Sequence, residues 1–127
     1  MAYAFNDDKS KAEVYSKDEI IVLRKTFNAA SGASVTSFNL TDECGIDADD
    51  WDKYVVLSVM QRDSLSRVFQ TAFKTSGSGS TNVYPTAALE RVYNSTTRDY
   101  YASCAVSVYN YSSARDYEVM VTLMKVS

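Results

Sequence analysis

The chain contains no histidine among its 127 residues. This absence excludes Ser–His and Cys–His nucleophile pairs, and it removes both the commonest general base and the usual zinc ligand. Carboxylate or tyrosine chemistry would remain open, but no pair of such residues is singled out by its spacing. We therefore expect no enzymatic activity and no cofactor.

Positive charge and long apolar runs are also scarce. The formal net charge is −3, so the chain has no basic excess that could neutralise nucleic-acid phosphates. No run approaches the roughly 20 apolar residues of a membrane span, and the first residues lack the cationic and apolar regions of a signal peptide. We expect neither nucleic-acid binding nor membrane insertion, and the sequence predicts a protein made in a cytoplasm.

The chain has only two cysteines, Cys44 and Cys104, and they do not form a metal-binding CxxC pair. In a reducing compartment such cysteines are usually small buried hydrophobic residues. We therefore expect two free thiols rather than a disulfide.

The densest polar segment is DECGIDADDWD at 42–52. Alternating carboxylates could hold Ca²⁺, but an EF-hand loop starting at Asp47 would need Gly and Glu where this sequence has Asp52 and Ser58. The favoured interpretation is a solvated acidic loop, with a weak surface cation site as the alternative. No metal ligands are assigned.

Aromatic residues are abundant: ten Tyr, five Phe and one Trp make up 13% of the chain. Tyrosine is typical of half-buried strand surfaces and interfaces, because its ring is apolar and its hydroxyl can stay in water. The candidate ligand-binding residues are Trp51, Tyr93, Tyr100, Tyr101, Tyr109 and Tyr111. They could cap the core, form contacts between subunits or stack on sugar rings, and the sequence leaves these three interpretations open.

Most of the chain has the alternating or β-branched pattern of strands. The predicted strands are 34–40, 54–61, 67–75, 85–93, 100–110 and 117–126, with a short helix as an alternative at 85–93. The last two are expected to form an antiparallel hairpin. The sequence thus predicts a mainly β protein, with an antiparallel β-sandwich or jelly-roll-like domain over 33–127.

The segment KAEVYSKDEIIVLRKTF at 11–27 predicts a short helix ahead of the strands. Ser16 and Glu19 have the spacing of a capping box, and Ile20, Leu23 and Phe27 follow at helical intervals. Such a helix of about 12 residues is marginal alone and must bury its apolar stripe. Residues 1–32 are therefore expected to form an arm and helix for oligomerisation or docking, and packing on the chain's own domain is the alternative.

Two short segments carry a resemblance to a known group of proteins. The N-terminal DDKSKAEVYSKDEI, in which Tyr15, Ser16, Lys17, Glu19 and Ile20 match, resembles segments that recur in bacteriophage tail-fibre, baseplate and head-fibre proteins. The C-terminal YEVMVTLMKV resembles the closing strand of phage fibre and receptor-binding domains.

This resemblance implies a non-enzymatic virion structural protein, such as a short fibre, a decoration protein or an adaptor. It implies assembly as a homo-oligomer, a trimer, in which the helix around Ile20, Leu23 and Phe27 joins the subunits. The implied partners are other copies of the chain and the capsid, tail or baseplate, after synthesis in the bacterial host cytoplasm. The alternative function is a carbohydrate-binding module for host receptor recognition, using Trp51 and the tyrosines.

Overall fold

The computed structural model describes residues 13–17, 19–74 and 82–126. Strands make up most of this part of the chain, and its helices are short. The strands are β1 Glu13–Lys17, β2 Ile20–Ala29, β3 Gly32–Asn39, β4 Tyr54–Asp63, β5 Phe73–Lys74, β6 Asn82–Val83, β7 Thr86–Asn94, β8 Asp99–Asn110 and β9 Arg115–Lys125, and the helices are α1 Leu40–Cys44 and the 3₁₀-helix η1 Ala48–Lys53. The expected mainly β fold class is confirmed.

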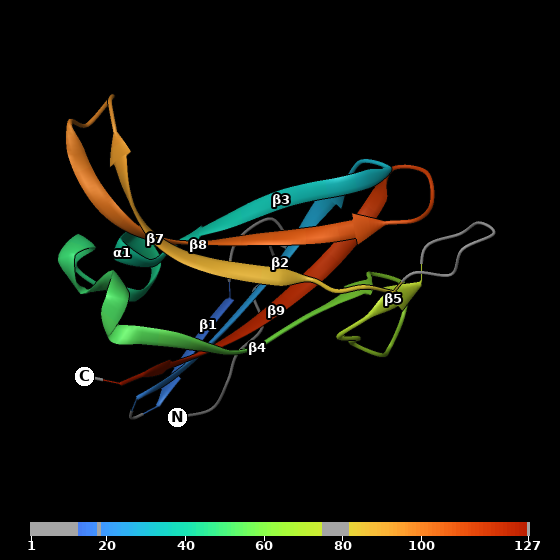
Figure 1. Ribbon diagram of the computed structural model, residues 1–127, viewed down its shortest axis with the longest axis horizontal. Helices are drawn as coiled ribbons and strands as arrows, with labels where there is room; N and C mark the ends of the chain where they lie inside the picture. Colours follow the sequence, from blue (N-terminus) through green and yellow to red (C-terminus); the bar gives the residue numbers. More distant parts are fainter. Residues whose placement is uncertain (1–12, 18, 75–81, 127) are drawn as a thin grey trace.

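Two antiparallel sheets face each other across the core (Figure 1). Sheet A has the strand order β1-β2-β9-β4, and sheet B has the order β3-β8-β7, while β5 and β6 form a small separate pair. Strand β4 of sheet A contacts β7 of sheet B at one side of the molecule, and β2 contacts β3 at the other. The arrangement is a β-sandwich, and a jelly-roll topology is not confirmed.

The expected N-terminal helix is wrong. Within 11–27, the described residues form β1 and most of β2, which pairs antiparallel with β1 on one side and with β9 on the other. Of the other positions in 11–27, Glu19 lies in a turn, and residues 11, 12 and 18 lie outside the described residues. Residues 20–22 are Ile-Ile-Val, a β-branched run that favours a strand. A short helix is marginal in water, whereas β2 gains ladder hydrogen bonds and belongs to the sandwich itself.

The other strand predictions fare better. The segments 34–40, 54–61, 85–93, 100–110 and 117–126 correspond to β3, β4, β7, β8 and β9, so 85–93 is a strand and not a helix. The strand expected at 67–75 is wrong for most of its length. Its described residues before Phe73 form only an isolated bridge, between Gln61 and Gln70.

The last two long strands do not form the expected hairpin. Strand β8 pairs with β3 and β7 in sheet B, whereas β9 pairs with β2 and β4 in sheet A. The turn at 111–114 therefore carries the chain from one sheet to the other. Asn110, which is fully buried at this crossing, hydrogen-bonds to the end of β2 through the carbonyl of Ala29. Alternation of apolar residues along a strand predicts which side chains are buried, but it does not predict which strand lies beside it. The assignment of buried side chains in β8 and β9 therefore does not depend on the wrong hairpin.

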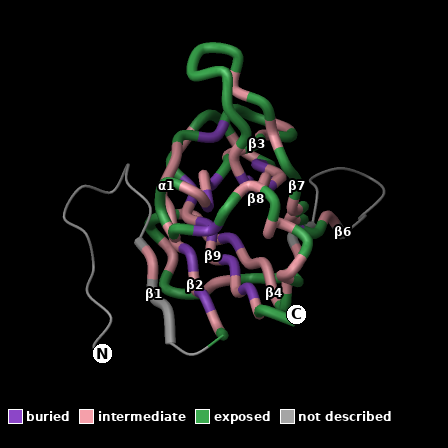
Figure 2. The backbone as a smooth tube through the Cα atoms, turned by 90° about the vertical axis from the view of Figure 1, so that its left-hand side faces the viewer, coloured by how far each residue is buried: buried purple, intermediate pink, exposed green. Residues whose placement is uncertain are grey.

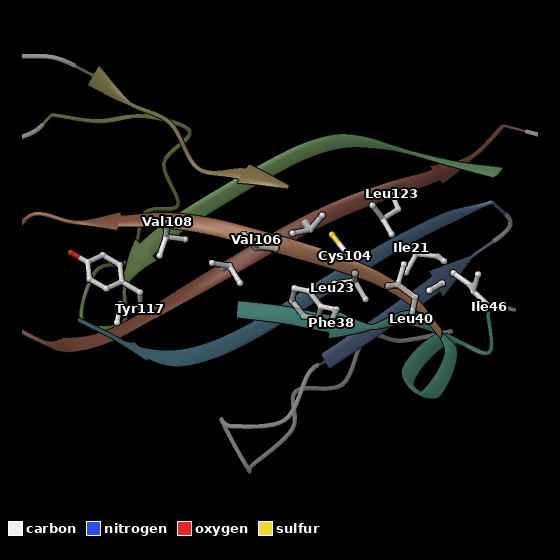
Figure 3. Packing of buried hydrophobic residues seen from close by; sticks show 14 residues of the cluster. Ile21, Leu23, Phe38, Leu40, Ile46, Cys104, Val106, Val108, Tyr117 and Leu123 are labelled. Carbon is white, nitrogen blue, oxygen red and sulfur yellow. The ribbon is translucent and has the colours of Figure 1, made fainter. Parts of the chain in front are cut away.

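The core fills the space between the two sheets (Figures 2 and 3). Its larger members are Ile21, Leu23, Phe38, Leu40, Ile46, Cys104, Val106, Val108, Tyr117, Val119, Val121 and Leu123. Figure 3 places Tyr117 at one end of this cluster and Ile46 at the other. In β8 and β9 the buried apolar residues Cys104, Val106 and Val108, and Val119, Val121 and Leu123, alternate with less buried ones, because every second residue of a strand points to the same side.

A short helix, α1, which the sequence pattern did not predict, follows β3 on the way from sheet B to sheet A. The side-chain oxygen of Asn39 accepts a hydrogen bond from the Asp42 N–H at 3.0 Å, and so caps the start of α1. Gly45 ends the helix with φ 71°, a left-handed conformation that glycine adopts without strain. The acidic segment 42–52 is thus largely the end of α1 and η1, and not the expected loop.

Candidate functional site

The three residues predicted to form an assembly stripe do not share one face of β2. Leu23 is 0% exposed and Phe27 packs against the core, so both point into the sandwich. Ile20 lies on the opposite face, because its distance along the strand from Leu23 is an odd number of residues. Of the three, Ile20 alone remains available for contact with another molecule.

The outward side of sheet A nevertheless carries apolar side chains on its three long strands. We call this set the outer apolar face: Ile20, Val22, Val55, Met60, Met120 and Met124. Met124 lies between Ile20 and Val55 in the register, and Met120 lies beside Met60. All six are half-buried or exposed. The outward side of an antiparallel sheet is usually polar, so this composition favours contact with a further surface.

A group of charges borders the outer apolar face at one end. Glu118 accepts hydrogen bonds from the Nε atoms of Arg24, at 2.9 Å, and of Arg62, at 2.6 Å. The ring of Phe69 lies over both guanidinium groups, with its centroid 4.5 Å from Arg62 and 5.4 Å from Arg24. The three charges are therefore partly shielded and neutralise one another in part, so they act as a polar border more than as a separate site.

The structure separates the six candidate ligand-binding aromatics. Trp51 in η1 packs against the core, and Tyr101 and Tyr109 are half-buried in β8. Tyr111 is exposed in the turn between β8 and β9, at the end of β8 opposite to the β7–β8 hairpin tip. Of the six, Tyr93 and Tyr100 come together near the tip of that hairpin, whose outer end projects beyond the other strands of the two sheets (Figure 1).

These two tyrosines form the best-defined polar and aromatic group on the surface, which we call the tyrosine cluster. The rings of Tyr93 and Tyr100 meet edge to face with centroids 5.1 Å apart, and they are 51% and 42% exposed. The guanidinium carbon of Arg91 lies 3.6 Å from the Tyr100 centroid, and its Nε is 3.1 Å from Asp49 Oδ1. Tyr100 is thus held by its neighbours, whereas Tyr93 keeps a largely free ring.

The two tyrosines were candidates from the sequence, whereas the pairing of Arg91 with Asp49 was not predicted. Asp49 comes from η1 and Arg91 from β7, and the two elements meet only in the folded chain. The nearby Asp50 accepts a hydrogen bond from Lys53, which raises the pKa of that ammonium group. Across the described ranges, no three His, Cys, Asp or Glu side chains gather in a way that could hold a metal ion.

A polar pocket of about 250 Å³ opens at the end of the sandwich next to α1. Its lining includes Glu19, Cys44, Asp50, Tyr54 and Lys125. Burial raises the pKa of the Cys44 thiol to about 11 and also raises the pKa of Tyr54. Both groups are therefore protonated at neutral pH, so the pocket offers neither an activated thiolate nor a phenolate nucleophile.

Comparison with protein families, curated proteins and solved structures finds no match to this chain. The helices in the described part of the chain are all too short and too polar to cross a membrane.

Proposed function

We propose that the protein is a non-enzymatic structural component of a bacteriophage virion, a short fibre, decoration protein or adaptor, that assembles as a homo-oligomer. The observation that carries this proposal is the outer apolar face of sheet A. The resemblance of the first and last segments of the chain to phage fibre proteins supplies the virion context. It implied a trimer joined by an N-terminal helix, and because that segment contributes to β1 and β2, we assign the contact between copies to the outer apolar face instead. Copies of the chain and the capsid, tail or baseplate are then its partners.

The outer apolar face supports assembly because burying it would be favourable. Transfer of apolar surface out of water contributes about 25 cal/mol per Å². Met60, Met120 and Met124 add side chains that adapt their shape to a partner surface. The ion-paired side chains of Glu118, Arg24 and Arg62 provide a polar rim at one end of this face. Protein interfaces usually have such a rim around an apolar centre.

Light scattering on the intact chain tests the assembly. We expect an oligomer whose mass falls in Met124→Lys, because this substitution places a charge in the centre of the row formed by Ile20, Met124 and Val55. The matched control is Thr86→Lys, which adds the same charge to an exposed position of β7 in sheet B and leaves the mass unchanged. A wild-type monomer at all concentrations contradicts the proposal. Mass spectrometry of purified phage particles that encode the chain tests its presence in the virion.

The tyrosine cluster favours a second candidate function, saccharide binding at a cell surface. The C–H face of a pyranose ring can stack on the exposed ring of Tyr93, and the Arg91–Asp49 pair can donate to and accept from neighbouring hydroxyl groups. The net charge of −3 disfavours nucleic acid as the stacking ligand.

Nuclear magnetic resonance titration with trisaccharides of glucose and of N-acetylglucosamine tests this second function. We expect shifts confined to the neighbourhood of the tyrosine cluster and an affinity that falls roughly fivefold in Tyr93→Ala, which corresponds to the loss of one aromatic contact of about 1 kcal/mol. Tyr111→Ala is the matched control, since Tyr111 is similarly exposed but lies in the turn at the other end of β8. Shifts that persist in Tyr93→Ala, or no shift with any of the sugars, would exclude the site.

A further inference from the structure

Strand β3 is one of the two edge strands of sheet B, and β7 is the other. Strand β3 pairs with β8 on one side, and in the described part of the chain no strand pairs with its other side (Figure 1). In an antiparallel ladder the N–H and C=O of one residue point to the same side, and successive residues alternate. The residues whose backbone groups face the free side can therefore be identified.

Contacts on both sides of the ladder identify the same residues. The Ser37 carbonyl accepts a hydrogen bond from Lys25 Nζ at 2.7 Å, so the backbone N–H and C=O of Ser37 point away from β8. On β8, the Tyr109 carbonyl accepts a hydrogen bond from the Gln61 side chain of β4 at 2.9 Å. The backbone groups of Tyr109 therefore point away from β3, and those of its partner Ala33 point away from β8. Ala33 and Ser37, and by alternation Val35 between them, thus present their N–H and C=O groups to the free edge.

This edge lacks the features that usually keep edge strands apart. Charged residues, proline and bulges discourage edge-to-edge pairing. The sequence of β3 is GASVTSFN, which contains no charge and no proline, and its ladder with β8 runs without a register shift. Lys25 reaches the edge from sheet A at Ser37, near one end of the strand. The centre, at Val35, is left open, and the Val35 side chain is 65% exposed.

The two sheets differ in width beside this edge, as far as the described strands show. Strand β4 contacts β7 and β2 contacts β3, so β1, on the far side of β2, has no counterpart among the described strands of sheet B. Val14 of β1 still packs against the core. One more strand next to β3 would lie over β1 and complete the smaller sheet.

We infer that β3 pairs with β3 of a second copy of the chain, antiparallel about a two-fold axis at Val35. The backbone groups of Ala33, Val35 and Ser37 that face this edge have the same spacing in both directions, so the edge is complementary to itself. The Ser37 carbonyl, which already accepts from Lys25, can accept a second hydrogen bond through its other lone pair. Val35 then exchanges both backbone hydrogen bonds with its counterpart, and Ala33 of each copy meets Ser37 of the other. An uncharged strand meets its own copy without repulsion.

The inference rests on the proposed function, because it names one contact through which copies assemble. It is compatible with other contacts through sheet A, since a two-fold edge contact combined with a trimer gives a hexamer of D₃ symmetry. The outer apolar face and the β3 edge belong to different sheets, so each contact can be broken by its own substitution.

The test is light scattering of the full chain carrying Val35→Pro. Proline removes the N–H that faces the free edge while leaving the ladder with β8 intact, and edge strands tolerate it in that orientation. We expect the mass of the assembly to fall twofold, with the circular dichroism spectrum unchanged. Val35→Thr is the matched control, because it keeps the N–H and the β-branched shape, and it should retain the wild-type mass.

The outcomes separate the two proposals. If Met124→Lys lowers the mass and Val35→Pro does not, the pairing of β3 is overturned and the proposed function stands. A wild-type chain that is monomeric throughout overturns both. If Val35→Pro does not fold, Val35→Asp decides, since it places two carboxylates face to face at the axis: a twofold lower mass supports the pairing and an unchanged mass overturns it.

Discussion

Replacing Asn110 should lower the free energy of unfolding more than replacing most other polar residues of this protein. Its amide nitrogen donates to the carbonyls of Ala29, at 2.9 Å, and Ser113, at 3.1 Å. Its oxygen accepts from the Ser112 N–H at 2.9 Å and from the Tyr117 hydroxyl at 3.1 Å. The side chain is 0% exposed, and all of its hydrogen-bonding capacity is used. Asn110 therefore connects three elements at the point where the chain changes sheets: the end of β2, the turn that follows β8, and the strand β9.

The cost of Asn110→Ala follows from these four bonds. A hydrogen bond contributes about 1 kcal/mol net, and a buried group left without its partner costs about 1–3 kcal/mol. Because water cannot reach the site without rearrangement, we expect a loss of about 3–5 kcal/mol in the free energy of unfolding. Tyr117→Phe removes one of the bonds and should cost about 1 kcal/mol. The double variant should cost less than the sum of the two, because both substitutions remove the shared bond.

Urea unfolding followed by the fluorescence of Trp51 measures these costs, since this residue is the sole tryptophan and packs against the core. Asn28→Ala is the matched control: Asn28 is an exposed asparagine near the same turn, bonded to Asp116, and should cost less than about 0.5 kcal/mol. Equal costs at Asn28 and Asn110, or additive effects of the Asn110 and Tyr117 substitutions, would refute the buried network and with it the placing of the crossing between the sheets.

Three further predictions concern single positions. In urea titrations, Leu23→Ala should lower the free energy of unfolding by about 2–5 kcal/mol and Ile20→Ala by less than about 1 kcal/mol. The reason is that only Leu23 points into the core. Equal costs at the two positions would instead support a helix, in which both residues lie on one face. The hydrogen bonds from the Leu65 N–H and Arg115 hold the pKa of Asp63 below its usual value. The ionised carboxylate therefore stabilises the fold above about pH 4 and loses this effect as the pH falls, so Asp63→Asn should show a shallower loss of stability in acid; an unchanged acid profile would contradict this. Cys44, with its pKa raised to about 11, should react with iodoacetamide at pH 8 about 100-fold more slowly than a free thiol, as mass spectrometry would show, and a rate close to that of the free thiol would place Cys44 in water.

The sequence predicts the faces of the long strands well. In β8 and β9, alternation separates Cys104 and Val106 from their polar neighbours, and Val119 and Val121 from Met120, and these inward residues are buried. Period-two alternation is a local property, so it can be recognised without knowledge of the partner strand. Pairing is not local, and for this reason the hairpin expected between β8 and β9 is wrong.

The error at the N-terminus has a different physical origin. Ser16 and Glu19 satisfy the spacing of a capping box, and Ile20, Leu23 and Phe27 satisfy the spacing of a helical stripe. The same segment also alternates, with Ile21 and Leu23 on one side. In a short segment tertiary pairing outweighs local propensity, and β2 lies between β1 and β9, a context that the sequence does not display.

The candidate sites were only partly visible in the sequence. The sequence YEVMVTLMKV places apolar residues on both sides of the last strand, with Met120 and Met124 on one side, so the second apolar face of β9 can be read from alternation alone. The tyrosine cluster was not predictable as a group, since Asp49 reaches Arg91 from a separate helical turn. The open edge of β3 depends on sheet order and on the direction of backbone groups, and side-chain patterns carry no information about either.

The two proposed contacts and the tyrosine cluster occupy different parts of the molecule. An assembly can therefore present several tyrosine clusters at once, which raises its apparent affinity for a sugar-covered surface. The β3 edge and β7 lie at opposite sides of sheet B, and the outer apolar face belongs to sheet A. Assembly through either contact therefore leaves Tyr93 and Tyr100 at the outer end of the hairpin exposed (Figure 1). A single small aromatic site binds sugars weakly, but several copies on one rigid assembly can raise the apparent affinity by about 10²–10⁴ without any new contact. An assembly that displays the cluster outward would thus join the two candidate functions in one particle, and Val35→Pro should then weaken binding to a multivalent glycan surface while leaving the affinity for a free trisaccharide unchanged.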